Sequence, residues 1–171
     1  AAGSKATLSP DAPQRVSAYL PVPANKPIKG TLSRGDARAT LDLSVAPGEF
    51  ATVFALDDGG KIQQRVVREQ PDDFNALKAS LAFISLDPAC QAPGLRRAGR
   101  NAALFKDRAD GSVQRRSINP VKLSVQLVCA NANVGNPLDL GELKAGERYS
   151  VMLLPGAEGP HLLNTTDTLS N

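Results

Sequence analysis

The alternation of apolar and polar side chains at every second position most restricts what this chain can fold into. Residues 37–45 (ARATLDLSV) and 121–130 (VKLSVQLVCA) place their apolar side chains on one side of an extended backbone. No stretch of ten or more residues keeps the 3.6-residue period of an amphipathic helix. The chain is therefore predicted to be all-β.

Similar patterns predict the remaining strands, at residues 16–22, 49–56, 61–67, 77–86, 101–106, 112–118, 148–154 and 160–166. The steps Asp58-Gly59 and Asp110-Gly111 predict hairpins, because glycine supplies the backbone conformation that a tight turn needs. The tripeptide Arg34-Gly35-Asp36 is interpreted as another hairpin turn rather than as an integrin-type motif. Residues 87–99 are expected to form an irregular loop.

A polar segment over residues 68–75 interrupts the strands and predicts a boundary between two domains, with a short helical turn beginning near Pro71. The boundaries expected are a flexible arm over 1–13, an N-terminal sandwich over 14–72 and a C-terminal sandwich over 76–171. A Gly-Glu pair opens a strand at 48–49 and again at 146–147. This internal similarity favours two small immunoglobulin-like β-sandwich domains in tandem over one large barrel.

The scarcity of reactive residues excludes several kinds of chemistry. One His and two Cys are too few ligands for a zinc site, so neither a metal nor a cofactor is expected. His161 is the one imidazole, and no Gly-Asp-Ser turn supplies it with a nucleophile, so no catalytic residue is predicted. The acidic pairs Asp57-Asp58 and Asp72-Asp73 fall in predicted turns and are interpreted as solvated.

The two cysteines are the most specific pair in the sequence. Cys129 lies on the apolar side of a predicted strand and Cys90 lies in the loop at 87–99. In an oxidising compartment they are expected to form a disulfide, and the alternative is two separate thiols.

The net charge of +3 comes from the second half of the chain. Between positions 96 and 122 there are eight basic residues and only two acidic ones. A nucleic acid is not the expected partner, because the stretch lacks interleaved aromatic residues and a recognition helix. An acidic protein face, an anionic polysaccharide or simple solvation remain open for the basic surface, which is predicted to comprise Arg96, Arg97, Arg100, Arg115, Arg116 and Lys122.

One short segment resembles a known family. Ile118, Asn119, Pro120, Val121 and Lys122 enter a predicted strand, and a Gly-Glu corner follows further along the chain. This segment is similar to one in the AlgF-like family of periplasmic adaptor proteins for exopolysaccharide O-acetylation. Residues 78–86 and 140–156 resemble the opening and closing strands of that family's second domain. The first half of the chain is similar only in the placement of its predicted strands.

The resemblance implies a secreted, non-catalytic protein of two β-sandwich domains. It would work in the periplasm beside a membrane-bound O-acyltransferase and an SGNH-type acetyltransferase that modify alginate or cellulose, and could contact the polysaccharide itself. The small residues 1–4 are then expected to be the end left by signal-peptide cleavage. The alternatives are a carbohydrate-binding or chaperone-like β-sandwich module and, third, an acetyltransferase in its own right.

Overall fold

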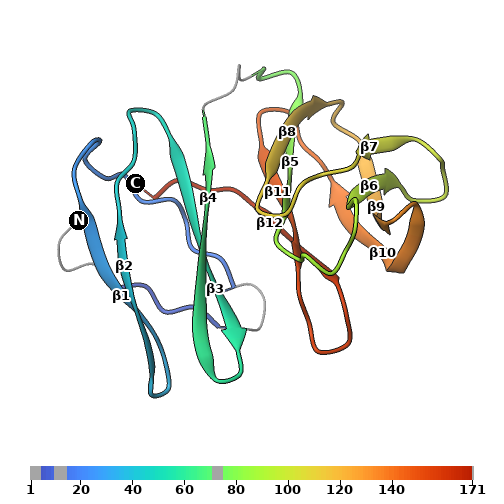
Figure 1. Ribbon diagram of the computed structural model, residues 1–171. Coiled ribbons are helices and arrows are strands. Elements are labelled where there is room, and N and C mark those ends of the chain that lie inside the picture. Colours follow the sequence, from blue (N-terminus) through green and yellow to red (C-terminus); the bar gives the residue numbers. More distant parts are fainter. Residues whose placement is uncertain (1–4, 10–14, 71–74, 171) are drawn as a thin grey trace. The chain divides into compact units, whose positions relative to one another are not determined.

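The computed structural model describes residues 5–9, 15–70 and 75–170 (Figure 1). These residues form twelve β-strands and no helix, which confirms the prediction of an all-β fold. None of the described segments is a helix long and apolar enough to cross a membrane. The chain divides into two compact units, one made of Ala1–Pro71 with Thr168–Asn171 and the other of Asp72–Asp167.

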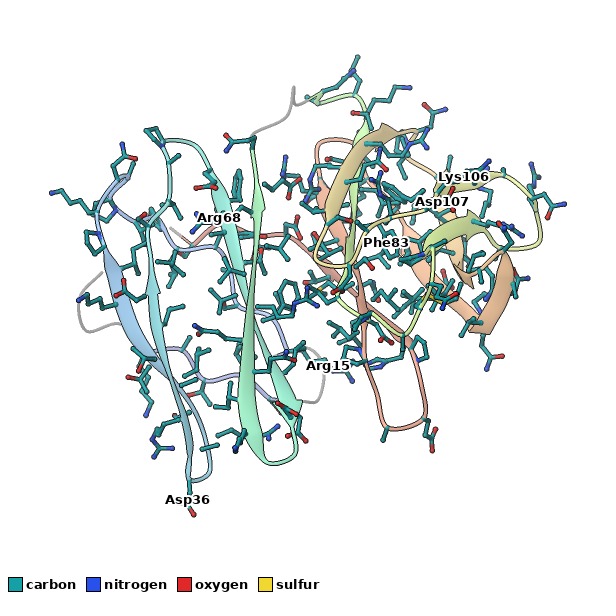
Figure 2. The ribbon with its side chains drawn as sticks, in the orientation of Figure 1. Arg15, Asp36, Arg68, Phe83, Lys106 and Asp107 are labelled. Carbon is teal, nitrogen blue, oxygen red and sulfur yellow. A yellow bond between two sulfur atoms is a disulfide. The ribbon has the colours of Figure 1, made fainter. Side chains whose placement is uncertain are left out.

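Two antiparallel hairpins build the first unit. Strand β1 (Ile28–Arg34) pairs with β2 (Ala37–Leu43), β3 (Phe50–Asp58) pairs with β4 (Lys61–Glu69), and β2 contacts β4. Gly35 adopts a φ of 56° in the first turn, so the interpretation of Arg34-Gly35-Asp36 as a hairpin turn is confirmed. Asp36 points away from the tip of that hairpin (Figure 2).

The first unit has few buried apolar residues, and one tyrosine packs on β3. Val45, Phe54 and Val67 are its buried apolar residues among those described. The Tyr19 ring meets Phe50 edge-on at 5.2 Å between ring centroids, and its hydroxyl lies 2.7 Å from Thr52 Oγ1. The backbone of Tyr19 forms a parallel bridge with Leu169 near the chain's C-terminus. The predicted strand over 16–22 is reduced to this bridge, because prolines at 21 and 23 have no N–H to donate.

The second unit is a sandwich of two four-stranded sheets. One sheet has the order β12-β11-β5-β8 and the other β10-β9-β6-β7. All neighbours are antiparallel except β5 and β11, which run parallel. The strands are β5 (Ala79–Ser85), β6 (Gly94–Arg97), β7 (Ala103–Phe105), β8 (Val113–Ile118), β9 (Lys122–Cys129), β10 (Ala132–Glu142), β11 (Arg148–Leu154) and β12 (His161–Thr166).

Alternate residues of these strands fill the space between the two sheets. Leu81 and Phe83 on β5 and Leu153 on β11 face residues such as Leu127 of the other sheet, and all are at most 2% exposed. Phe83 lies in this interior (Figure 2), with its ring centroid 5.7 Å from that of Phe105. Because aromatic residues are only 4% of the chain, branched aliphatic side chains supply most of the core.

The predicted disulfide between Cys90 and Cys129 is present. It joins the segment between β5 and β6 to the last residue of β9, with the two Cα atoms 5.1 Å apart. The Ala130 N–H donates to the carbonyl oxygen of Gln91 at 2.6 Å, so a backbone hydrogen bond supports the same junction.

Three strands were not predicted from the sequence, namely β1, β6 and β10. Strand β6 lies inside the segment 87–99, which was expected to be a loop, because prolines and glycines surround its four residues. Strand β10 carries Asn, Gly and Pro residues that are uncommon in strands. They are tolerated because β10 is an edge strand with irregular register on either side of Leu138.

The prediction of a hairpin at Asp110-Gly111 is wrong. The strands on either side of this turn belong to different sheets, because β7 pairs with β6 whereas β8 pairs with β5. Gly111 has the positive φ of 75° expected in a tight turn. Its N–H donates to the carbonyl oxygen of Ser85 at 2.7 Å, so the turn leads the chain from one layer of the sandwich to the other.

The two Gly-Glu corners have the same local geometry. Gly48 and Gly146 have φ values of 76° and 81°, and each following N–H donates to a carbonyl oxygen three residues earlier. Each corner leads into a strand, β3 or β11. Those strands occupy sheets of different size and order, so the similarity is confined to the turn and its strand.

Several predictions fall outside the described residues. Of the N-terminal arm over 1–13, only residues 5–9 are described. Residues 71–74, which include the expected helical turn and the pair Asp72-Asp73, also lie outside this range.

Candidate functional site

Side chains on β9 alternate between the core and the outer face of the β10-β9-β6-β7 sheet. Leu123, Val125 and Leu127 point into the sandwich, so Ser124 and Gln126 face outward. The Gln126 amide donates to the carbonyl oxygens of Val134 at 2.9 Å and of Gly135 at 3.2 Å, which fastens the irregular part of β10 over this face.

Three of the predicted basic residues meet around one shallow hollow on this face. We call it the basic hollow, and it is lined by Arg97, Ala98, Arg100, Lys122 and Ser124. No acidic side chain lines it. Among the described residues, none lies within ion-pair distance of the three cations. The basic hollow therefore brings three positive charges together, with Glu142 and Asp139 of β10 directly across from Lys122 and Ser124.

A tight turn after β6 sets the backbone positions of Arg97 and Arg100. The Arg100 N–H donates to the carbonyl oxygen of Arg97 at 3.1 Å, and Gly99 supplies the positive φ of 72° that the turn requires. The Ala98 N–H donates to the carbonyl oxygen of Ser124 at 2.9 Å, which ties the turn to β9. Lys122 reaches the same hollow as the first residue of β9.

A second hollow lies at the other end of β6 and β9. Its polar lining residues are Arg96, Asn101, Lys106, Asp107 and Asn131, and we call it the polar hollow. Lys106 and Asp107 lie next to one another beside β7 (Figure 2). The floor includes Gly94 and Val128, so the strands β6 and β9 run from one hollow to the other.

The remaining two arginines of the predicted basic surface lie elsewhere. Arg115 Nη2 donates to Asp167 Oδ2 at 2.9 Å, and the exposed fractions of the two side chains are only 4% and 6%. Arg116 Nη1 donates to the carbonyl oxygen of Leu104 at 2.6 Å. The structure thus divides the predicted surface: Arg97, Arg100 and Lys122 line the basic hollow and Arg96 lines the polar hollow, whereas Arg115 is engaged within its own sheet.

The segment that resembles the AlgF-like family forms the connection between the two sheets. Ile118 ends β8, and Lys122 begins β9 at the edge of the basic hollow. Lys78 Nζ donates to Asn119 Oδ1, which holds the turn against the residues that precede β5. Leu77 stands beside this contact with 80% of its surface exposed. We call Leu77, Lys78, Asn119 and Pro120 the connection corner.

The residues considered for catalysis are dispersed. His161 begins β12 and is exposed, and Asp57 and Asp58 are the last two residues of β3 in the other unit, not part of the turn as the sequence predicted. The hydrogen bond from Arg34 to Asp57, assisted by the Gly60 N–H, lowers the pKa of that carboxyl below 3.8. No group of three or more His, Cys, Asp or Glu among the described residues could hold a metal ion.

The uncharged members of the two hollows were not predicted from the sequence. Ser124 lies in the polar half of the alternating segment 121–130, so its outward direction was available from the pattern. Nothing in the sequence pattern indicated that Asn101 and Asn131 would line a hollow. They approach the cations only through the turn after β6 and the hairpin between β9 and β10, in which Ala130 and Asn131 both have positive φ values.

The chain matches no protein-family model and no curated protein sequence. Among solved structures, it is similar to the C-terminal domain of AlgF from P. aeruginosa, with 23% sequence identity and a TM-score of 0.44. The match covers 53% of this chain and 98% of that domain.

Proposed function

We propose that this protein is a non-catalytic periplasmic adaptor in the O-acetylation of a secreted exopolysaccharide, alginate or cellulose. It would bring together the SGNH-type acetyltransferase and the membrane-bound O-acyltransferase of one secretion system. The observation that carries the proposal is the segment from Ile118 to Lys122, which resembles the AlgF-like family and lies at an exposed corner of the sandwich.

The disulfide supports a periplasmic location. Disulfides persist in oxidising environments such as the bacterial periplasm and are rare in the cytosol. Cys90 is 4% exposed, and its partner ends a central strand of its sheet, so the bond is an internal part of the sandwich.

The connection corner supplies a surface suited to a protein partner. Leu77 is the most exposed of the large apolar side chains that the structure describes, and Pro120 lies in the adjacent turn. The contact between Lys78 and Asn119 joins the two segments that form the corner. Protein–protein interfaces have an apolar centre surrounded by a polar rim, and an exposed leucine can contribute to such a centre.

Binding of the purified chain to the SGNH-type acetyltransferase of the same secretion system tests the adaptor role. We expect Leu77→Asp to weaken that binding roughly tenfold or more, because the change would place a charge in the apolar centre of the interface. Leu20→Asp is the matched control, since Leu20 is 52% exposed in the first unit. No binding by the unchanged chain, or equal loss in both variants, would contradict the proposal.

An enzyme assay tests the proposal that the protein is non-catalytic. The chain alone should not turn over an acetyl donor ester. Turnover that His161→Ala abolishes would show instead that the protein is an acetyltransferase in its own right.

A further inference from the structure

We propose that the open edge of β12 binds a short extended segment of a partner protein, which adds as a further strand to the β12-β11-β5-β8 sheet. Strand β12 stands at the end of this sheet and pairs with β11 over all six of its residues, without a shift in register. The segment would bind mainly through its backbone, as strands that add to the edge of a sheet do.

The backbone of β12 offers N–H donors at this edge. The Asp167 N–H, directly after β12, donates to the carbonyl oxygen of Arg148 in β11 at 2.8 Å. Because successive N–H groups of an antiparallel strand point to opposite sides, those of Leu162, Asn164 and Thr166 point away from β11. None of these three N–H groups donates to another described residue. The side chains of Asn164 and Thr166 are exposed, so the edge is accessible there.

The other edge strands of the second unit carry features that discourage an added strand, whereas β12 carries none of them. Charged side chains, proline, bulges and short length are the usual protections of an edge. Strand β7 has only three residues, and β8 carries Arg115 and Arg116. Strand β10 carries Pro137, Asp139 and Glu142 and has two shifts in register. The six residues of β12 include no proline, glycine, lysine, arginine or acidic residue, so this edge favours an added strand.

The surroundings of the edge favour an uncharged segment with apolar side chains at every second position. Leu162 lies opposite Leu153 of β11 and is partly buried against the core. Strand β10 of the other sheet contacts β12, and its Leu140 is also partly buried against the core. Every second side chain of an added strand would face this margin of the core, where apolar groups are stabilised by burial. The strand β12 itself has no charge that would balance a charged side chain there.

The size of the edge suits a peptide segment rather than a second folded copy of this chain. Six residues of a strand span about 20 Å, and packed sheets lie about 10 Å apart, so the edge offers roughly 200 Å². A stable interface between two folded proteins buries about 800 Å² on each partner. An extended segment needs no such area from the edge alone, because it belongs to a partner that can also be held elsewhere.

Titration of the purified chain with a synthetic peptide tests the site, with amide chemical shifts and hydrogen exchange as readouts. The peptide alternates threonine and valine over its central positions, with lysines before them and glutamates after them for solubility. We expect shifts at Leu162, Asn164 and Thr166 and slower exchange of their N–H groups. The same peptide with N-methyl groups on its two central amides should bind about tenfold more weakly or less, because neighbouring N–H groups serve opposite edges of a strand.

Matched variants locate the site on β12. Asn164→Lys keeps the backbone and should weaken peptide binding about tenfold or more, because a charge at the edge opposes an added uncharged strand. Asn164→Pro removes an N–H that points away from β11 and should weaken binding similarly. Ser117→Lys, which places the same charge at an exposed position of the β8 edge, should leave binding within about twofold.

Four results would overturn the proposal. Three of them are no binding of the peptide, equal binding of its N-methylated form, and equal weakening by Asn164→Lys and Ser117→Lys. The fourth is self-association of the chain in analytical ultracentrifugation that slows exchange of the same three N–H groups, which would make this edge an interface between two copies.

Discussion

Arg115 and Asp167 form an ion pair across the full width of the β12-β11-β5-β8 sheet, with 2.9 Å between Nη2 and Oδ2. Arg115 lies on the edge strand β8, and Asp167 directly follows the opposite edge strand β12. In the strands between them, Ser80 Oγ accepts from Arg115 at 3.3 Å and Ser150 Oγ donates to Asp167 at 3.0 Å. These contacts supply the polar partners that buried charges require.

Replacing Asp167 by Ala is expected to lower the free energy of unfolding by about 3–5 kcal/mol, because the change leaves a buried guanidinium without its counter-charge. Chemical denaturation followed by circular dichroism measures the loss. Replacing both partners together, Arg115→Met with Asp167→Leu, should cost less than Asp167→Ala alone. Arg116→Ala is the control and should change stability by less than about 1 kcal/mol, and a larger effect there would contradict this assignment.

The strands with strict alternation were predictable, because in them one face is core and the other is solvent. Strand β9 shows this clearly, with Leu123, Val125 and Leu127 buried on one side. Strand β10 was not predictable in the same way. Its Pro137 and two glycines are tolerated only at the edge of a sheet, and edge position is a property of the whole fold.

The candidate site was predictable only as a list of cations. The density of basic residues between 96 and 122 singled out Arg97, Arg100 and Lys122 without showing that they share a hollow. Nor could charge alone distinguish them from Arg115. That difference depends on Asp167, which lies far away in sequence and becomes a neighbour only because β12 and β8 are edges of one sheet.

The disulfide offers a second test of stability. Replacing Cys90 and Cys129 together by Ala should lower the free energy of unfolding by about 4 kcal/mol, because the bond restricts the unfolded chain over a separation of 39 residues. Denaturant titrations of the variant and of the reduced wild-type protein measure the effect. Reductant should leave the variant unchanged, and an equally stable wild-type protein with and without reductant would contradict the prediction.

Gly94 marks a close approach between β6 and β7. A Cβ atom added there would lie 2.7 Å from the carbonyl oxygen of Phe105, which belongs to the backbone and cannot rotate away. We expect Gly94→Ala to lower the free energy of unfolding by about 1–3 kcal/mol. The control is Gly30→Ala in β1, where the nearest atom is 3.8 Å from the added Cβ. Equal stability of both variants in denaturant would contradict the expected clash.

Glu49 links the corner before β3 to the neighbouring strands. Its Oε2 accepts from the Ala46 N–H at 2.7 Å and from Arg68 Nη1 at 3.1 Å. The Ala46 hydrogen bond is the main reason that the pKa of Glu49 lies below its ordinary value of 4.5, with Arg68 contributing further. Arg68 Nη1 also donates to the carbonyl oxygen of Ser44 at 2.7 Å, so the same arginine connects β4 to the segment after β2.

Acid should therefore weaken the first unit through Glu49. Since the folded pKa is the lower one, the carboxylate contributes its full stabilisation above 4.5 and loses it as the pH falls through the folded value. Unfolding midpoints measured between about pH 6 and about pH 3 should fall less steeply for Glu49→Gln than for the wild-type protein. Asp36→Asn, at the tip of the β1–β2 hairpin, removes a carboxylate outside this network and should keep the wild-type slope. If the unfolding midpoint of Glu49→Gln falls with pH as steeply as that of the wild-type protein, the prediction is contradicted and other carboxylates cause the acid sensitivity. Asp57, which pairs with Arg34, would be tested next.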